Sequence, residues 1–282
     1  MSSSSRTVLI TGATGKQGGA LVRHLAGKGF SLKAMTRNPG SDAAKALAAR
    51  GIEVVAGDLN DAASLKTALT GVWGAFAVQN TWEAGVAGEE EQGKRFATVA
   101  RDAGVQHLVY TSVGSAHLKT GIPHFDNKSR IEDTVRALTF PSWVILRPVF
   151  FMENLVSPWF LNGDTLVTAM KPTTRLQMIA SDDIGKVAAQ AFIRADDFNG
   201  KAIDLAGDTA TMTEAAAVLS QALGRPITFM QIPMSEVRKN SEDFALMLEW
   251  FESTGYSADI PAVERLFNVR MTRLAEWAKQ LR

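Results

Sequence analysis

TVLITGATGKQGGAL, residues 7–21, joins an apolar, strand-like run to a glycine cluster and then to a segment with helical spacing. The glycines follow the pattern G-x-x-G-x-x-G, and each has a physical role at a dinucleotide site. Gly12 permits a sharp turn, Gly15 lets a diphosphate approach the backbone, and Gly18 lets helix and strand pack closely. The N-terminus of the helix then offers N–H groups and partial positive charge to the anion. The other loop residues that we expect to contact the nucleotide are Thr14, Lys16 and Gln17.

Apolar segments alternate with helix-like segments through the first half of the chain. The apolar segments are hydrophobic on both faces, which is typical of a parallel sheet covered by helices on both sides. The predicted strands are 7–11, 31–37, 51–59, 72–79, 106–112 and 142–148. The predicted helices lie at about 18–28, 41–50, 61–69, 89–103 and 125–138. We therefore expect an α/β fold with a doubly wound parallel sheet, the Rossmann fold.

This alternation breaks after Pro148, at the aromatic-rich stretch FFMENLVSPWF. Later segments are predicted as a helix after Asp183, strands at 201–207 and 226–233, and helices at 213–223 and 262–281. We predict a nucleotide-binding Rossmann domain over residues 6–150. A smaller C-terminal α/β domain for substrate or partner is predicted mainly over residues 151–282, with residues from about 178 to 206 returning to the Rossmann sheet.

The composition excludes several classes of function. The 282 residues are 46% hydrophobic and carry a formal net charge of +1, so neither nucleic acid nor a membrane surface is an expected partner. No apolar run approaches the roughly 18 residues of a membrane span. The chain has no cysteine and only 4 histidines, so we expect neither disulfides nor a metal site. The first residues do not resemble a signal peptide, which favours a cytoplasmic protein. The oligomeric state is not indicated.

The end of the second predicted strand bears on the choice of nucleotide. Sites that prefer NAD place Asp or Glu about 20 residues beyond the glycines, whereas this chain has Thr36-Arg37-Asn38. Arg37 suits the 2′-phosphate of NADP, with NADPH preferred over NADH, although it could be a solvated surface arginine. Asp58 and Leu59 follow the third strand and are expected at the adenine edge. Asp58 could instead cap the next helix.

The motifs TGATGKQG, MTRN, GDL, VQNTWE, YTSVG, HFDNK and ILRPVFFMENL, in this order and spacing, resemble the NmrA-like family. That family contains atypical members of the short-chain dehydrogenase/reductase superfamily. The likeness runs from about Thr7 to Leu155, and more weakly through SDDIG at 181–185 to the C-terminal helix. It implies a Rossmann domain, bound NADP or NADPH, and a small C-terminal domain whose cleft faces the nicotinamide. It also implies either a reductase of quinones, dyes or phenylpropanoids, or a regulator that senses the NADP/NADPH ratio and binds a protein partner.

The resemblance also predicts an unusual catalytic pair. Ordinary superfamily members use Tyr-x-x-x-Lys on one helix face, with tyrosine as the acid and lysine on the nicotinamide ribose. Here His124 occupies the tyrosine position and Lys128 is retained, while neither Tyr110 nor Tyr256 precedes a lysine at that spacing. His124 could donate the proton, because histidine does so near neutrality. Alternatively a quinone-like acceptor takes its proton from water, or the protein turns nothing over. His124 could also be only a helix-start residue, and Lys128 a surface lysine.

Further candidates follow other predicted strands, where open parallel sheets bind ligands. Gln79 and Asn80 are expected beside the nicotinamide ribose, with Ser112 as a tentative catalytic hydroxyl. Pro148 and Phe150 are expected near the carboxamide. The predicted substrate pocket consists of Trp82, Phe151, Asn154 and Trp159. Aromatic residues at such spacing could instead be core.

The acidic run at 89–91 is interpreted as the charged N-terminus of a helix and not as a metal site. The sequence as a whole favours an oxidoreductase that passes hydride from NADPH to an apolar, quinone-like or carbonyl acceptor. A non-catalytic NADP(H) redox sensor that acts through a protein partner is the alternative.

Overall fold

The computed structural model describes residues 6–281, in which the chain forms two compact units. The expectation about a signal peptide concerns the first five residues, which lie outside the described part. The first unit runs to Ser112 and includes Asn127–Leu146 and Ile184–Ile203. The second comprises Val113–Asp126, Arg147–Asp183 and the chain from Asp204 onward. The domain boundary predicted near residue 150 stays a prediction, because these units are defined by contacts and not by independent folding.

The first unit is built on a seven-stranded sheet with the order β11-β6-β5-β4-β1-β2-β3. Its strands are β1 (Arg6–Ile10), β2 (Phe30–Thr36), β3 (Glu53–Ala56), β4 (Gly74–Ala77), β5 (His107–Thr111), β6 (Ser142–Pro148) and β11 (Lys201–Leu205). The pairings from β3 across to β6 are parallel. The order reverses at β1, which lies between β2 and β4, and ligands of such sheets bind where this reversal occurs.

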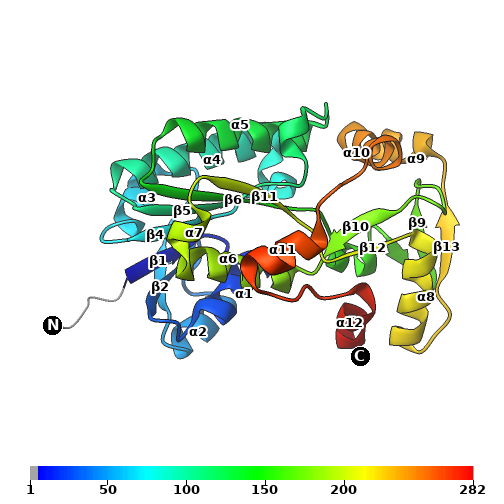
Figure 1. The fold of residues 1–282 in the computed structure, drawn as a ribbon, viewed down its shortest axis with the longest axis horizontal. Coiled ribbons are helices and arrows are strands. Elements are labelled where there is room, and N and C mark those ends of the chain that lie inside the picture. The colour runs from blue at the N-terminus through cyan, green and yellow to red at the C-terminus, as the bar shows by residue number, and fades with distance from the viewer. Residues whose placement is uncertain (1–5, 282) are drawn as a thin grey trace. The chain divides into compact units, whose positions relative to one another are not determined.

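Helices cover both faces of this sheet. They are α1 (Lys16–Leu25), α2 (Asp42–Ala49), α3 (Ala62–Ala68), α4 (Thr81–Asp102), α5 (Pro123–Ala137), α6 (Ser181–Ile193) and α7 (Ala195–Phe198). Figure 1 shows α3, α4 and α5 on one face and α1, α2 and α6 on the other. Between α1 and α6 the approach is close, since a Cβ added to Gly185 would lie 2.5 Å from the carbonyl carbon of Ala20. The predicted Rossmann fold is confirmed.

Two predicted helices are corrected. The helix expected at about 89–103 begins at Thr81, because the Asn80 side chain accepts a hydrogen bond from the Trp82 N–H and caps it. Gly85, with φ of 72°, separates this first turn from the rest of α4. The helix expected over 262–281 is two helices, α11 (Ile260–Phe267) and α12 (Leu274–Ala278), followed by a 3-10 turn. Asn268, with φ of 53°, ends α11.

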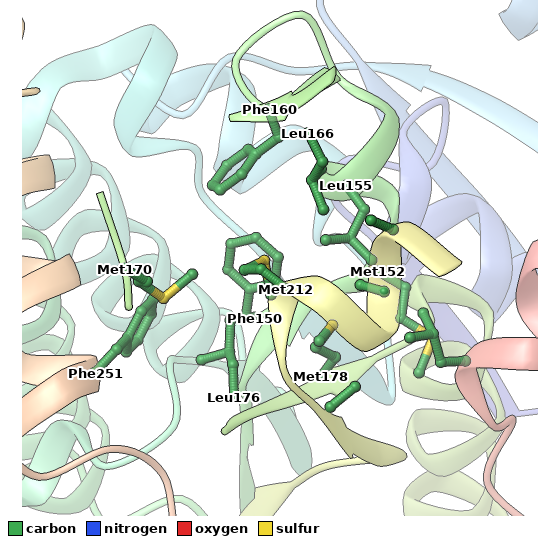
Figure 2. Close-up of a cluster of buried hydrophobic side chains, with 14 of the residues drawn as sticks. Phe150, Met152, Leu155, Phe160, Leu166, Met170, Leu176, Met178, Met212 and Phe251 are labelled. Atoms are coloured by element: carbon green, nitrogen blue, oxygen red, sulfur yellow. The ribbon is translucent and has the colours of Figure 1, made fainter. Parts of the chain in front are cut away.

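The second unit contains two small sheets, of order β12-β10-β7 and β13-β9-β8. Its strands are β7 (Phe150–Phe151), β8 (Leu161–Asn162), β9 (Thr165–Thr168), β10 (Leu176–Ile179), β12 (Asp208–Ala210) and β13 (Thr228–Gln231). Its further helices are α8 (Met212–Leu223), α9 (Met234–Asn240) and α10 (Glu242–Ser253). Figure 2 shows its apolar core, in which methionines and leucines surround Phe150. None of the described helices is both long and apolar enough to cross a membrane.

His107 is buried at the start of β5 in the first unit. Its Nδ1 lies 2.8 Å from Ser142 Oγ, and its ring stacks on Trp73 and meets the edge of Phe192. Burial lowers the pKa of His107 from 6.5 to about 4. The folded protein therefore takes up this proton only near pH 4, whereas the unfolded chain takes it up near pH 6.5. The free energy of unfolding consequently falls as the pH falls through this window.

We predict that His107→Gln weakens this acid sensitivity. The loss of unfolding free energy between pH 7.5 and 4.5, measured by urea denaturation, should be smaller than in the wild type by roughly 2 kcal/mol. His24→Gln, which makes the same substitution at a half-buried histidine on α1, is the comparison variant. Equal pH dependence in His107→Gln and the wild type would contradict the assignment.

Candidate nucleotide-binding site

The glycine loop between β1 and α1 has the close packing that its pattern predicts. Gly12 has φ of 58°, and a Cβ there would lie 2.8 Å from Val78 Cγ1. A Cβ on Gly18 would lie 2.4 Å from the Gly12 carbonyl oxygen, so both positions exclude a side chain. A Cβ on Gly15 would come only within 3.3 Å of that oxygen. Packing within the protein therefore requires glycine less strictly at position 15 than at positions 12 and 18. This agrees with the predicted role of Gly15, which is to let a diphosphate approach the backbone.

The first turn of α1 is arranged for an anion. Gly15 is the N-cap and supplies no side-chain hydrogen bond to the turn, which contains no acidic residue. The N–H groups there retain their partial positive charge. Thr14, Gly15 and Lys16 are exposed around the turn, while Gln17 accepts a hydrogen bond of 2.7 Å from Thr111 Oγ1. The structure thus brings the predicted loop residues together at one accessible helix start.

The ends of β4 and β5 lie beside this loop. Thr11 Oγ1 donates to the Val78 carbonyl at 3.1 Å and accepts from its N–H at 2.8 Å, which ties the end of β1 to that of β4. β4 and β5 are parallel, and Ala77 is paired with Tyr110. Two residues further along each chain, Gln79 therefore lies opposite Ser112.

Gln79 is buried, and neither its amide nitrogen nor its amide oxygen has a hydrogen-bond partner within the protein. Buried amides are almost always partnered, so Gln79 is suited to the hydroxyl groups of a bound ribose. Asn80 differs, because its side chain already caps α4. Ser112 is buried at the end of β5, and its backbone N–H donates to the Leu146 carbonyl.

Arg37 follows β2 directly and is exposed, as expected for a residue that meets a phosphate. Its guanidinium forms an ion pair with Glu83, in the first turn of α4. No local pattern in the sequence indicates this partner, because the two residues are 46 positions apart and on different elements.

Asp58 and Leu59 follow β3. The alternative that Asp58 caps the next helix is wrong, because Asp61 is the N-cap of α3 and accepts from the N–H groups of Ala63 and Ser64. Asp58 Oδ1 accepts instead from the Asn60 N–H at 2.8 Å within the preceding turn. The Leu59 carbonyl accepts from Arg95 at 2.9 Å. Both residues therefore belong to an ordered turn at the end of β3.

Lys128 is not a surface lysine. Its side chain is 14% exposed, and its Nζ lies 2.5 Å from Glu89 Oε2 and 3.0 Å from Thr81 Oγ1. Asn127 also donates to Glu89 Oε2, at 2.9 Å, and Thr81 donates to the same oxygen. One buried carboxylate thus joins α4 to α5 and holds the ammonium group of Lys128.

The interpretation of residues 89–91 as a charged helix N-terminus is correct in position but incomplete. Gly85 interrupts the helical backbone of α4, so these residues lie near the start of its longer segment. Glu89, however, lies on the buried face of that segment with Gly93, Phe96, Ala97 and Ala100. That spacing of three and four residues is the signal that could have identified Glu89 as a buried acid. Among residues 6–281, no group of three or more acidic or histidine side chains could hold a metal ion.

His124 lies near the start of α5, in the portion that belongs to the second unit. It is buried, and its Nδ1 lies 2.6 Å from Asp243 Oδ1 on α10. Its ring meets the edge of Phe125 at 4.9 Å. A carboxylate at Nδ1 fixes the orientation of the imidazole and places a proton on that nitrogen. Asp243 was missed by the sequence analysis, which predicted no helix at 242–253.

The two tyrosines do not replace the missing acid. Tyr110 is fully buried in the first unit, and burial raises its pKa well above the ordinary value of 10. Tyr256 packs in the second unit against the rings of Phe125, Trp250 and Phe251, and burial raises its pKa in the same direction.

The candidate pocket residues are distributed over both units. Phe150 is buried in the second unit, with its ring 5.2 Å from Phe160 and 6.3 Å from Phe251, so its side chain is committed to the core. Trp82 in the first unit is 67% exposed, and Trp159 in the second is 81% exposed, so neither tryptophan is a core residue. Phe151 and Asn154 are half-buried, and Pro148 ends β6 with its carbonyl accepting from the Gly114 N–H. A substrate pocket at these residues stays a prediction.

Comparisons with known proteins agree with this architecture. Residues 4–280 match the model of the NmrA-like family. An NAD(P)H azoreductase of Xenophilus azovorans is 31% identical over 82% of this chain and 79% of its own. The NmrA-like oxidoreductase FrzB of a Cladobotryum species is 28% identical over 88% of this chain and 84% of its own. The structure of the NADPH-dependent quinone oxidoreductase QOR2 of Escherichia coli, in complex with NADPH, superposes with a TM-score of 0.82 at 27% identity, and covers 97% of this chain and 99% of that one.

We predict that the ion pair between Glu89 and Lys128 is strongly coupled. Glu89→Gln leaves a buried ammonium group without its counter-charge and should lower the free energy of unfolding by roughly 3 kcal/mol. The double variant Glu89→Gln/Lys128→Met should cost less than the sum of the two single variants by about 1 kcal/mol or more. Urea denaturation of the four proteins measures both effects. Glu91→Gln, an exposed acid on the same helix, should change stability by less than about 0.5 kcal/mol. Additive single variants would show that the pair is not coupled.

Proposed function

The chain belongs to the NmrA-like family, and from this membership and the geometry above we propose that it is an NADPH-dependent oxidoreductase. Its acceptor would be an apolar, quinone-like or carbonyl compound. The proposal rests on three features at the ends of the strands in the first unit, where the strand order reverses. At Gly15 the glycine loop has no side chain that would block a diphosphate, and the first turn of α1 contains no acidic residue. The buried amide of Gln79 has no hydrogen-bond partner within the protein. The likeness to reductases that use NADPH supports it.

Each part of the nucleotide would have a partner among these residues. The glycine loop and first turn of α1 would hold the diphosphate, with Arg37 and Lys16 on the 2′-phosphate. Asp58 and Leu59 would meet the adenine, and Gln79 and Asn80 the nicotinamide ribose together with Lys128. The bound nucleotide supplies the hydride.

His124 would hold the proton that the reduced acceptor takes up, at Nε2. His124 and Lys128 are four residues apart on α5 and so occupy one face of that helix. Asp243 is then a positioning residue, since it contacts only the far nitrogen, Nδ1. A quinone that has received hydride needs one proton to become the neutral hydroquinone, and a fixed imidazolium can provide it.

We expect the nucleotide preference to depend on Arg37. Calorimetric titration should show tighter binding of NADPH than of NADH to the wild type. Arg37→Gln should weaken NADPH binding roughly tenfold or more, because a charge-assisted hydrogen bond to the 2′-phosphate is lost, and should change NADH binding less than about twofold. Arg50→Gln, at an exposed arginine that ends α2, is the control and should bind both nucleotides as the wild type does. Equal binding of NADPH by Arg37→Gln and the wild type would contradict the assignment.

We expect turnover to depend on His124. A panel of quinones added to the NADPH-loaded protein should cause loss of NADPH absorbance. His124→Ala should lower kcat roughly a hundredfold without changing the Kd of NADPH. Asp243→Asn should lower kcat less and shift the pH profile of kcat, which a purely structural contact would not do. A rate for His124→Ala close to that of the wild type would show that the acceptor takes its proton from water. Tight NADPH binding without turnover of any acceptor would favour a redox sensor instead.

A further inference from the structure

The ion pair between Arg37 and Glu83 links the segments that follow β2 and β4. Arg37 directly follows β2, Glu83 lies in the helical turn that follows β4, and β1 lies between these two strands in the sheet. Neighbouring strands are about 4.8 Å apart, so β2 and β4 are separated by about 10 Å at this edge. The ion pair thus bridges the ends of the two strands that flank β1, and β1 leads into the glycine loop.

The first turn of α4, which carries Glu83, is held in place by hydrogen bonds. Asn80 caps it, and Thr81 is held in the buried cluster with Glu89 and Lys128. Gly85, with its positive φ, separates the turn from the remainder of α4. The Glu83 carboxylate is therefore presented by an anchored element, while Arg37 sits on the loop after β2. In this respect the pair differs from ion pairs between two freely moving surface side chains, which contribute little to the free energy of unfolding.

We propose that Glu83 is a specificity-determining residue that competes with the 2′-phosphate of NADP(H) for the guanidinium of Arg37. This inference rests on the proposed function. The 2′-phosphate and Glu83 compete for the donors of the Arg37 guanidinium, and binding brings a phosphate dianion toward the Glu83 carboxylate. NAD(H) carries a hydroxyl group at that position and disturbs neither the ion pair nor the carboxylate. Glu83 therefore reduces the preference for NADP(H) that Arg37 alone would produce.

The test is calorimetric titration of wild type and Glu83→Gln with NADP⁺ and NAD⁺, which report binding without turnover. At low ionic strength, Glu83→Gln should bind NADP⁺ roughly fivefold more tightly, because the competing pair and the repulsion are both removed. Its affinity for NAD⁺ should stay within about twofold of the wild type. At high salt the gain for NADP⁺ should shrink to less than about twofold, because the groups are exposed and screened.

Two further variants make the result specific. Glu91→Gln removes the same charge from an exposed position on α4 and should leave both affinities unchanged. In the Arg37→Gln background, Glu83→Gln should give less than half of its gain, because the contested guanidinium is absent. Weaker or unchanged binding of NADP⁺ by Glu83→Gln, or equal gains for both nucleotides, would overturn the inference alone. Failure of the wild type to bind either nucleotide would overturn the proposed function as well.

Discussion

The buried ion pair between Glu89 and Lys128 is the constraint on which the ligand-facing side of the first unit depends. A charged carboxylate inside a protein is costly unless its charge is matched and hydrogen-bonded. Thr81, Asn127 and Lys128 all contact Oε2 of Glu89, and in doing so they fix the first turn of α4 against α5. Oε1 has no hydrogen-bond partner within the described protein, so Lys128 is the group that matches the charge. The same ammonium group is the predicted partner of the nicotinamide ribose. The lysine that stabilises the first unit is therefore also the one predicted to contact the ligand.

A second carboxylate performs a comparable task in the other unit. Asp243, on α10, orients His124 near the beginning of α5. The helix α5 contributes its first residues to one unit and its remainder to the other, so the two candidate functional side chains are supported by different cores. Where the family resemblance places a tyrosine, this chain has His124, and an acid elsewhere in the chain holds that imidazole in place.

Sequence reasoning succeeded where the signal was local. The G-x-x-G-x-x-G pattern, the apolar strands and the spacing of His124 from Lys128 are each contained in a few residues, and the glycine geometry and the sheet follow from them. It failed where the decisive contact joins distant segments. Glu89 pairs with Lys128, Asp243 with His124 and Glu83 with Arg37, and these partners are 39, 119 and 46 positions away in the sequence. None of the three contacts can be recognised from neighbouring residues. The true start of α4 was missed for a related reason, because a glycine in the second turn concealed the helical spacing and the capping asparagine was interpreted only as a ligand residue.

The close approach of Gly185 to Ala20 has a consequence for how variation in this chain is interpreted. Gly185 lies 167 positions beyond Gly18, on α6 and outside the glycine loop. Yet any side chain at Gly185 would push against the backbone of α1, and the start of that helix is the surface that would receive a diphosphate. A genetic screen for loss of nucleotide binding should therefore recover substitutions at Gly185 beside those in the loop. A natural substitution at Gly185 would therefore impair nucleotide binding indirectly, although the residue lies outside the glycine loop.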